Sequence, residues 1–171
     1  MEHVKALIRD VPDFPEPGIV FKDLTPVLAD GPALARVTSA LADPFTDRGI
    51  TAVAGMEARG FIFGALVAHA LGVGFVPLRK PGKLPAAAHN VAYDLEYGSA
   101  SLEMHIDAVG SGDRVLMVDD LIATGGTAAA SCELVTRAGA TIAGCAFVIE
   151  LDFLNGRDLL GECEIHSLIH Y

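Results

Sequence analysis

Two adjacent carboxylates and a glycine–hydroxyl run lie close together near the middle of the sequence. Residues 115–118 are a short, continuous apolar run, which predicts a buried strand, and Asp119 and Asp120 follow it directly. Residues 123–127 then combine two glycines, which let the backbone approach a ligand, with two threonine hydroxyls. A helix is expected to begin at Thr127, and its free N–H groups and positive end favour an anion. This run predicts a phosphate site beside a carboxylate pair that suits the hydroxyls of a ribose.

A simpler interpretation is that Gly125 and Gly126 form an ordinary strand-to-helix turn and that the two aspartates are surface caps. Acidic, hydroxyl and glycine residues gathered at one strand end favour a ligand site over that interpretation. The run is not a Walker A loop, which ends in Gly-Lys-Ser or Gly-Lys-Thr, and it is not a Gly-x-Gly-x-x-Gly dinucleotide turn.

Basic residues that could meet a second phosphate group lie at two other places in the chain. Arg59 follows the apolar run of residues 50–55, and its planar fork suits a pyrophosphate. Lys80 and Lys83 belong to residues 79–89, a basic stretch bounded by turn-forming residues that predicts a long mobile loop. The alternatives are a surface ion pair for Arg59 and a solvated basic loop for the two lysines.

The elements that must position these residues follow from the spacing of apolar residues. Helices are predicted at residues 4–9, 34–45, 61–71 and 127–138, with Pro32 close to the first turn of the second helix. Strands are predicted at residues 19–21, 50–55, 74–78, 115–118 and 142–149, and a hairpin at residues 91–97 and 100–106. Residues 11–18 contain three prolines and a glycine, which predicts an irregular arm without strand pairing. Alternating strands and helices indicate an α/β fold with a parallel sheet and ligands at its carboxyl edge.

Composition narrows the class of protein. The chain has 171 residues, 51% of them hydrophobic, which suits one domain with one buried core. Its net charge of -10 disfavours nucleic acid as a partner, and no apolar run reaches the length of a membrane span. Three cysteines, 13 and 18 positions apart, match neither a disulfide framework nor a metal knuckle, so we expect packing residues in a reducing cytoplasm. Residues 1–10 lack the apolar core of a signal peptide, and the histidines show no metal-binding spacing.

Residues 115–127 (VLMVDDLIATGGT) resemble the phosphoribosyl pyrophosphate signature of type I phosphoribosyltransferases. Residues 14–23, 55–61, 82–85 and 95–98 are similar, in the same order, to blocks of the adenine phosphoribosyltransferase family, so the resemblance covers almost the whole chain. It implies transfer of 5-phosphoribose from phosphoribosyl pyrophosphate to adenine with Mg²⁺, giving AMP and pyrophosphate. It also implies one domain over residues 1–171, with a hood from about residues 11–26 and the C-terminal region, a flexible loop at about 79–98, and a homodimer that uses the helix at 61–71.

The resemblance assigns roles to individual residues. The 5-phosphate would be held by Ala123, Thr124, Gly125, Gly126 and Thr127, and the ribose hydroxyls would face Asp119 and Asp120, with Mg²⁺ carried by the substrate and reached through water. Pyrophosphate would be bound by Arg59, Lys80 and Lys83, and a cis peptide bond would lie between Glu57 and Ala58. Glu96 would act as an acid at adenine N7, although an exposed strand glutamate is the simpler interpretation. The base would lie near Val20, Lys22 and Leu151.

Two positions depart from the family pattern, and two rival functions stay open. Lys22 stands where many relatives carry arginine, and Ala58 stands where a serine is common. One rival is a phosphoribosyltransferase for hypoxanthine, xanthine or orotate. The other is a regulator that binds phosphoribosyl pyrophosphate without turnover, but such a regulator would be expected to carry a basic face or a nucleic-acid-binding module.

Overall fold

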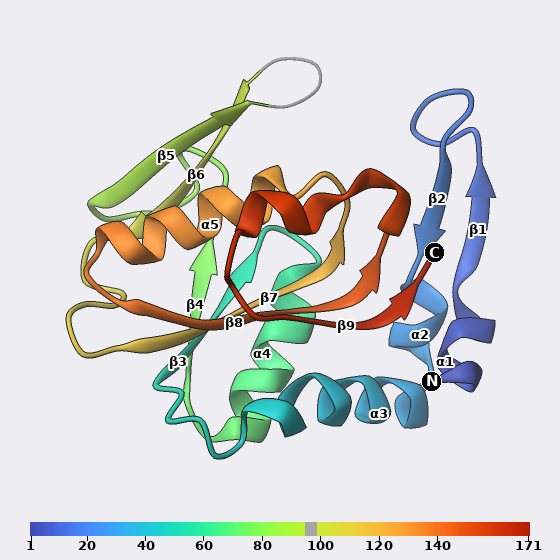
Figure 1. Cartoon of the computed structure of the whole chain (residues 1–171), viewed down its shortest axis with the longest axis horizontal. Helices are drawn as coiled ribbons and strands as arrows, with labels where there is room; N and C mark the ends of the chain where they lie inside the picture. The colour runs from blue at the N-terminus through green and yellow to red at the C-terminus, as the bar shows by residue number, and fades with distance from the viewer. Residues whose placement is uncertain (95–98) are drawn as a thin grey trace.

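The computed structural model covers residues 1–171 and describes all of them except 95–98 (Figure 1). Its centre is a five-stranded sheet in the order β4-β3-β7-β8-β9, and every neighbouring pair of strands is parallel. The strands are β3 (Ala52–Met56), β4 (Gly74–Leu78), β7 (Arg114–Ile122), β8 (Thr141–Glu150) and β9 (Ile165–His170). Chain order reverses between β3 and β7, and ligands of such sheets bind outside the carboxyl ends at that point. The predicted α/β fold with a parallel sheet is confirmed.

Strand β7 is buried on both faces. Val115 and Met117 pack into the core on one side of the sheet, whereas Leu116 and Val118 pack into the core on the other side. All four side chains are fully buried, which explains why the strand reads as a continuous apolar run instead of an alternating one.

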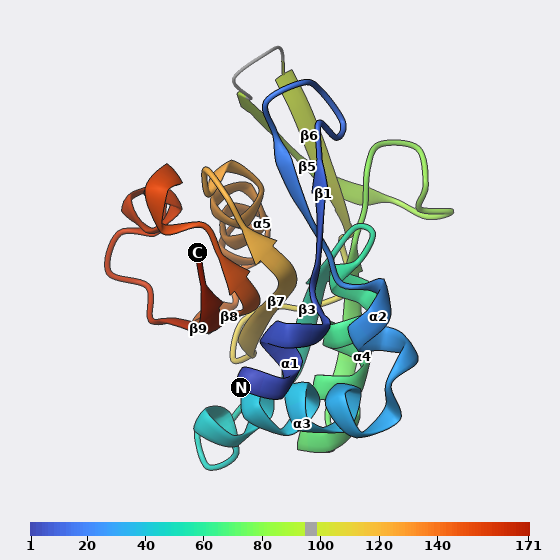
Figure 2. The same cartoon turned by 90° about the vertical axis from the view of Figure 1, so that its right-hand side faces the viewer.

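Helices cover both faces of the sheet (Figures 1 and 2). One face carries α3 (Gly31–Ala42) and α4 (Gly60–Leu71), with the short helices α1 (Glu2–Leu7) and α2 (Thr25–Ala29) beside them. The other face carries α5 (Gly126–Arg137). The Asp30 carboxylate accepts the Ala33 N–H at 2.8 Å, and Pro32 lies in the first turn, so α3 begins at a capped end. No helix among the described residues is long and apolar enough to cross a membrane.

Two hairpins stand beside the sheet, and their strands extend toward the same end of the molecule in both views (Figures 1 and 2). In the N-terminal hairpin, β1 (Arg9–Pro12) pairs antiparallel with β2 (Val20–Asp23). In the second, β5 (Ala88–Asp94) pairs antiparallel with β6 (Ser99–His105), which confirms the predicted hairpin. Its turn, and with it Glu96, lies outside the described residues.

The segment after β8 was not predicted from the sequence. Two short 3-10 helices, η2 (Asp152–Leu154) and η3 (Gly156–Leu160), lead into the edge strand β9, and another, η1 (Asp43–Phe45), extends α3. This segment lies next to the N-terminal hairpin, because Lys22 Nζ lies 3.9 Å from the centre of the Tyr171 ring. Gly156 of this segment also contacts Ala123 and Gly125, two residues of the predicted phosphate site.

Two expectations from the sequence are wrong in detail. Residues 11–18 were expected to lack strand pairing, yet Val11 pairs with Phe21 and Pro12 with Val20. Pro12 is tolerated because it is the last residue of a strand in a two-stranded sheet, where its missing N–H costs little. The strand predicted at residues 115–118 continues to Ile122, so Asp119 and Asp120 lie within β7 and not beyond it.

Candidate active site

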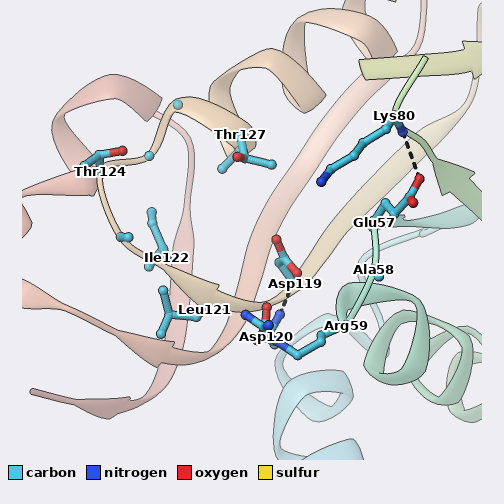
Figure 3. A pocket seen from close by; sticks show the side chains of 14 residues that line it. Glu57, Ala58, Arg59, Lys80, Asp119, Asp120, Leu121, Ile122, Thr124 and Thr127 are labelled. Carbon is cyan, nitrogen blue, oxygen red and sulfur yellow. Dashed lines mark hydrogen bonds and ion pairs between the residues drawn. The ribbon is translucent and has the colours of Figure 1, made fainter. Parts of the chain in front are cut away.

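A pocket of about 440 Å³ lies at the carboxyl ends of β3 and β7 (Figure 3). It is lined by residues that follow β3, by Lys80 after β4, and by the whole stretch from Asp119 to the first turn of α5. The predicted residues that line it are Arg59, Lys80, Asp119, Asp120, Ala123, Thr124, Gly125, Gly126 and Thr127. The fold therefore brings the residues predicted for the 5-phosphate and two of those predicted for pyrophosphate, Arg59 and Lys80, together where the chain order of the sheet reverses.

Asp120 and Arg59 form an ion pair at one side of the pocket. The Arg59 Nε–H donates to Oδ2 of Asp120, whose side chain is only 7% exposed, while the Arg59 side chain is 48% exposed. The guanidinium also lies 5.1 Å from the centre of the Phe21 ring, which is close enough for a cation–π contact. Arg59 is therefore in an ion pair, and about half of the surface of its side chain is still available to a ligand.

Asp119 lies beside Asp120 and accepts the Asp120 backbone N–H at 2.8 Å. Burial raises the pKa of the Asp119 carboxyl well above its ordinary value, and the neighbouring Asp120 charge raises that pKa further. A Cβ atom at Gly60 would come within 2.6 Å of Asp119 Oδ1, so only glycine fits where α4 begins. The site therefore holds a carboxylate that lacks enough positive charge around it, which is a favourable environment for a cationic or hydrogen-bonding ligand.

The predicted phosphate loop, residues 123–127, passes from β7 into α5. Gly125 has a φ of 85°, in the left-handed region that favours glycine, and no side chain caps the helix. The first N–H groups of α5 are therefore available to a ligand at the positive end of a twelve-residue helix. Tyr93 from the second hairpin contacts this loop, with its hydroxyl 3.3 Å from the Thr127 hydroxyl.

The loop rests on the C-terminal segment. A Cβ atom at Gly125 would meet the Gly156 carbonyl oxygen at 2.2 Å, so the two backbones are in direct contact. The next residue, Arg157, forms a bidentate ion pair with Glu150, in which the Nη2–Oε2 distance is 2.7 Å. Burial raises the pKa of the Glu150 carboxyl, but the hydrogen bonds and charge of Arg157, together with contributions from Ser167 and His170, hold it below its ordinary value. This pair anchors η3 to the end of β8 beneath the loop.

The loop between β4 and β5 is tied to the pocket by Glu57. Its carboxylate accepts the Lys80 backbone N–H at 2.8 Å and lies 3.3 Å from Arg79 Nε. The Lys80 side chain extends from there into the pocket (Figure 3). Lys83 is exposed and is not among the lining residues, and its carbonyl accepts from Arg79. The Glu57–Ala58 peptide bond is cis, as the resemblance implied.

The three residues expected at the base lie away from the pocket lining. Val20 is 49% exposed on β2, and the Leu151 N–H donates to the Ile122 carbonyl at 3.1 Å. The Lys22 side chain is held by Asp10, 2.7 Å from its Nζ, and by the Tyr171 ring. The structure therefore assigns the Lys22 ammonium to a contact between the N-terminal hairpin and the C-terminal segment.

Several residues of the site were missed from the sequence. Glu57 lines the pocket, while Phe21, Tyr93 and Gly156 each touch a residue that lines it. Glu57 adjoins Arg59 and could have been found as a charged residue at the same strand end. The other three come from distant parts of the chain, and nothing in the local sequence pairs them with the residues that they touch.

Comparisons with known proteins agree with this geometry. Residues 26–157 match the family model of the phosphoribosyl transferase domain. The chain is 64% identical to the adenine phosphoribosyltransferase of Methylococcus capsulatus over the full length of both chains. Among solved structures, the adenine phosphoribosyltransferase of Thermoanaerobacter pseudethanolicus superposes with a TM-score of 0.97 at 52% identity, covering 99% of each chain. That of Saccharomyces cerevisiae, in complex with an imino-altritol bisphosphate and adenine, gives 0.93 at 41% identity, covering 98% of this chain and 97% of the other.

Proposed function

The chain belongs to the adenine phosphoribosyltransferases, purine salvage enzymes that transfer 5-phosphoribose from phosphoribosyl pyrophosphate to adenine, and we propose that it does so in the pocket between β3 and β7. The observation that carries this placement is the convergence of the acidic pair, the phosphate loop and Arg59 on one pocket at the carboxyl ends of adjacent parallel strands. The products of the transfer are AMP and pyrophosphate.

The phosphate loop binds the 5-phosphate of both substrate and product. Its support is the open N-terminus of α5 and the glycine backbone at Gly125 and Gly126, which offer N–H donors without side chains in the way. The hydroxyls of Thr124 and Thr127 lie at the same pocket and add two further donors. This contact fixes one end of the sugar, so that its anomeric carbon is held in one position during transfer.

Arg59 and Lys80 neutralise the departing pyrophosphate. The Arg59 fork keeps about half of its surface exposed, and the Lys80 side chain extends into the pocket from the same side as Arg59 (Figure 3). Charge that appears on the leaving oxygens is stabilised by cations that are already in place. Lys83 lies outside the pocket lining in this conformation and would join them only when the loop closes.

Asp119 and Asp120 act on the ribose. As pyrophosphate leaves, positive charge develops at the anomeric carbon, and two carboxylates near the sugar hydroxyls stabilise that charge. The raised pKa of Asp119 supports this role, because a carboxyl that is destabilised when charged gains most from a neighbouring cationic centre.

The acidic pair also fits Mg²⁺, a hard cation that takes oxygen ligands and keeps several of its waters. Asp119 and Asp120 are the residues that would face it, through water, while the substrate carries it into the site. When bound, Mg²⁺ supplies charge neutralisation to the pyrophosphate oxygens.

Adenine recognition rests on the family resemblance. We place the base beneath the N-terminal hairpin near Val20, with backbone groups of Lys22 and apolar cover from Leu151, and we assign Glu96 as the acid at N7. Protonation of N7 lowers the electron density at N9, so an acid there helps the purine leave in the reverse reaction and takes its proton back in synthesis.

The remaining assignments concern the whole molecule. We propose one domain over residues 1–171, whose hood is the N-terminal hairpin together with the C-terminal segment, acting in the cytoplasm as a homodimer. Support for the hood is the contact between Lys22 and Tyr171, and support for the dimer is the exposed Ile62 on α4, with 42% of its surface accessible.

The test is turnover with phosphoribosyl pyrophosphate and Mg²⁺, with adenine, hypoxanthine, guanine and orotate supplied one at a time. We expect rapid release of pyrophosphate with adenine and little with the others. Equal turnover of hypoxanthine or guanine would contradict adenine selectivity, and release with none of the bases would contradict a catalytic pocket.

A further inference from the structure

The three cysteines of the chain come together in space, although they are far apart in the sequence. Cys132 lies on α5, Cys145 on β8, and Cys163 just before β9. The Sγ atoms of Cys132 and Cys145 are 3.7 Å apart, and those of Cys145 and Cys163 are 3.6 Å apart. All three sulfurs lie within 4.8 Å of one another. None of these residues lines the active-site pocket.

These separations match those of thiolates around one metal ion. For any third separation up to the 4.8 Å limit, the point in the plane of the three sulfurs that is equidistant from them lies no more than about 2.4 Å from each, and a zinc–thiolate bond is about 2.3 Å long. The triangle is acute throughout this range, so an ion at that distance sits among the sulfurs and not outside them. The three sulfurs are therefore spaced as the ligands of a single ion would be.

The chemistry of the donors selects the kind of ion. Three sulfur ligands and no carboxylate favour a soft or borderline cation over Mg²⁺ or Ca²⁺. Three glutamates are adjacent to cysteines in the sequence: Glu164 is paired with Arg48, Glu133 is paired with Arg137, and Glu162 is exposed and does not belong to the cluster. No other His, Cys, Asp or Glu in the described part of the chain belongs to the cluster. Cys132 and Cys163 are partly exposed, which leaves water for a fourth position.

The surroundings select the charge of the ion. The cysteines belong to or pack against the apolar core on the α5 side of the sheet, which includes Phe147 and Leu160. Three thiolates with a divalent ion leave one negative charge there, whereas three thiolates with a monovalent ion leave two, and uncompensated charge in apolar surroundings is costly. A divalent ion is therefore favoured.

We propose that Cys132, Cys145 and Cys163 form a binding site for one divalent thiophilic cation of the Zn²⁺ class, with water in the fourth position. Binding displaces the three thiol protons to solvent and leaves three metal–thiolate bonds, with no change in oxidation state. The ion ties α5 to β8 and to the segment before β9. Because α5 begins at the phosphate loop, the site reinforces the element that presents Thr127 to the substrate.

Cadmium is the probe, because Cd²⁺ bound to thiolates has a charge-transfer absorption band in the ultraviolet. We expect titration of untagged, metal-free protein in a non-thiol reductant to saturate at one Cd²⁺ per chain, with release of about three protons, one from each thiol. Addition of Zn²⁺ should displace the band. Saturating Zn²⁺ should also raise the melting temperature, since an ion that binds only the folded chain stabilises it.

Variants distinguish this site from others. Cys163→Ser, at a partly exposed position, should lose most of the band and the Zn²⁺-dependent rise in melting temperature, while its adenine turnover without added Zn²⁺ stays unchanged. Cys145→Ser should lose the band entirely. His170→Ala is the matched control, because His170 belongs to the other potential ligand group, Glu150–Asp152–His170, and it should leave the band unchanged.

Several outcomes would overturn the proposal. The absence of a band in wild-type protein, or a band of wild-type intensity in Cys163→Ser, would show that there is no three-cysteine metal site. Cd²⁺ that binds without forming the band, and whose binding is lost in His170→Ala, would assign the ion to the other group, which contains no thiol. A thiol assay that finds two of the three thiols lost on mild oxidation, in protein that binds no Cd²⁺ when reduced, would identify a disulfide pair instead.

Discussion

Gly156 lies directly against Ala123. A Cβ atom on Gly156 would come within 2.2 Å of the Ala123 carbonyl oxygen and within 3.0 Å of the Gly125 nitrogen. Both contacts are with backbone atoms, which cannot move aside as the end of a side chain can. The short helix η3 is therefore the surface on which the phosphate loop is shaped, even though it contributes no side chain to the pocket lining.

Gly156→Ala should displace the phosphate loop. We expect the KM for phosphoribosyl pyrophosphate to rise at least about tenfold, and the free energy of unfolding to fall by about 1–3 kcal/mol, the usual cost of overpacking. Steady-state kinetics and thermal melts measure the two effects. Gly110→Ala is the control, since a Cβ atom there meets nothing within 4 Å. Unchanged kinetics in Gly156→Ala would mean that η3 does not shape the loop.

Glu150→Gln should weaken the anchor of η3 in a pH-dependent way. The native pKa of Glu150 is lowered, so its pairing with Arg157 stabilises the folded chain above the ordinary glutamate pKa of 4.5 and loses that effect as pH falls through the native pKa. We expect the variant to be about 1–2 kcal/mol less stable at pH 7 and the difference to shrink below pH 4.5.

Chemical denaturation at a series of pH values measures this difference. Glu133→Gln is the control, because Glu133 is 48% exposed in its pair with Arg137, and such pairs contribute about 0.5 kcal/mol or less. A difference for Glu150→Gln that stayed constant into acid would show that the charge of Glu150 is not what stabilises η3.

Arg59→Lys keeps the positive charge but loses the planar fork and its contact with Phe21. We expect kcat/KM for phosphoribosyl pyrophosphate to fall by roughly ten- to a hundredfold, which corresponds to about 1.4–2.7 kcal/mol of transition-state stabilisation. Arg137→Lys, an exposed arginine on α5, is the control. Equal kcat/KM values in the two variants would show that Arg59 does not bind pyrophosphate.

Asp119→Asn should raise the melting temperature and lower kcat. Because the native pKa of Asp119 is raised, the native state holds its proton where the unfolded chain has released it, and ionisation destabilises the fold as pH rises above 3.8. We expect the variant to melt about 2–4 °C higher at pH 7, equivalent to about 1 kcal/mol for a chain of this size, with kcat at least about tenfold lower.

The gain in melting temperature should disappear below pH 3.8, where the carboxyl is neutral in both states. Asp47→Asn, at an exposed position, should change neither the melting temperature nor kcat. A variant at Asp119 that melted lower than wild type at pH 7 would show that the carboxylate is adequately compensated in the free enzyme.

Glu96→Gln tests the acid assigned to adenine N7. The substitution removes a proton donor and keeps the size of the side chain, so kcat should fall by about a hundredfold or more while the KM for phosphoribosyl pyrophosphate changes little. Glu162→Gln is the control, because Glu162 is exposed and does not line the pocket. Retention of wild-type kcat would remove the acid role.

The sequence located the phosphate loop because its residues are contiguous, and local chemistry is visible in a local pattern. The predicted end of β7 is too early, because the prediction rests on the local pattern of apolar side chains alone. Asp119 and Asp120 interrupt the apolar run, but backbone pairing with β8 continues past them, with Asp119 opposite Phe147 and Leu121 opposite Ile149. Strand pairing depends on the neighbouring strand and not only on the side chains of one segment.

What could not be predicted depends on contacts between distant segments. Gly156 reads as an ordinary turn residue, and its role follows only from the position of Ala123. The cysteines, with separations of 13 and 18 residues, match no short motif, yet three different elements bring them together. At Pro12 the local sequence was misleading. Its missing N–H suggests an irregular segment, but Pro12 pairs with Val20 in a two-stranded sheet, whose edge accommodates a proline.

The contact between the phosphate loop and Gly156 also bears on the order in which the chain folds. During synthesis the loop emerges before η3, so β7 and α5 can form while the surface that shapes the loop is still missing. Contacts of long sequence separation form late, because the intervening chain must first be ordered. The ability to hold a phosphate should therefore appear at the end of folding, and ligands with a 5-phosphate should slow unfolding of η3 before they affect the central sheet.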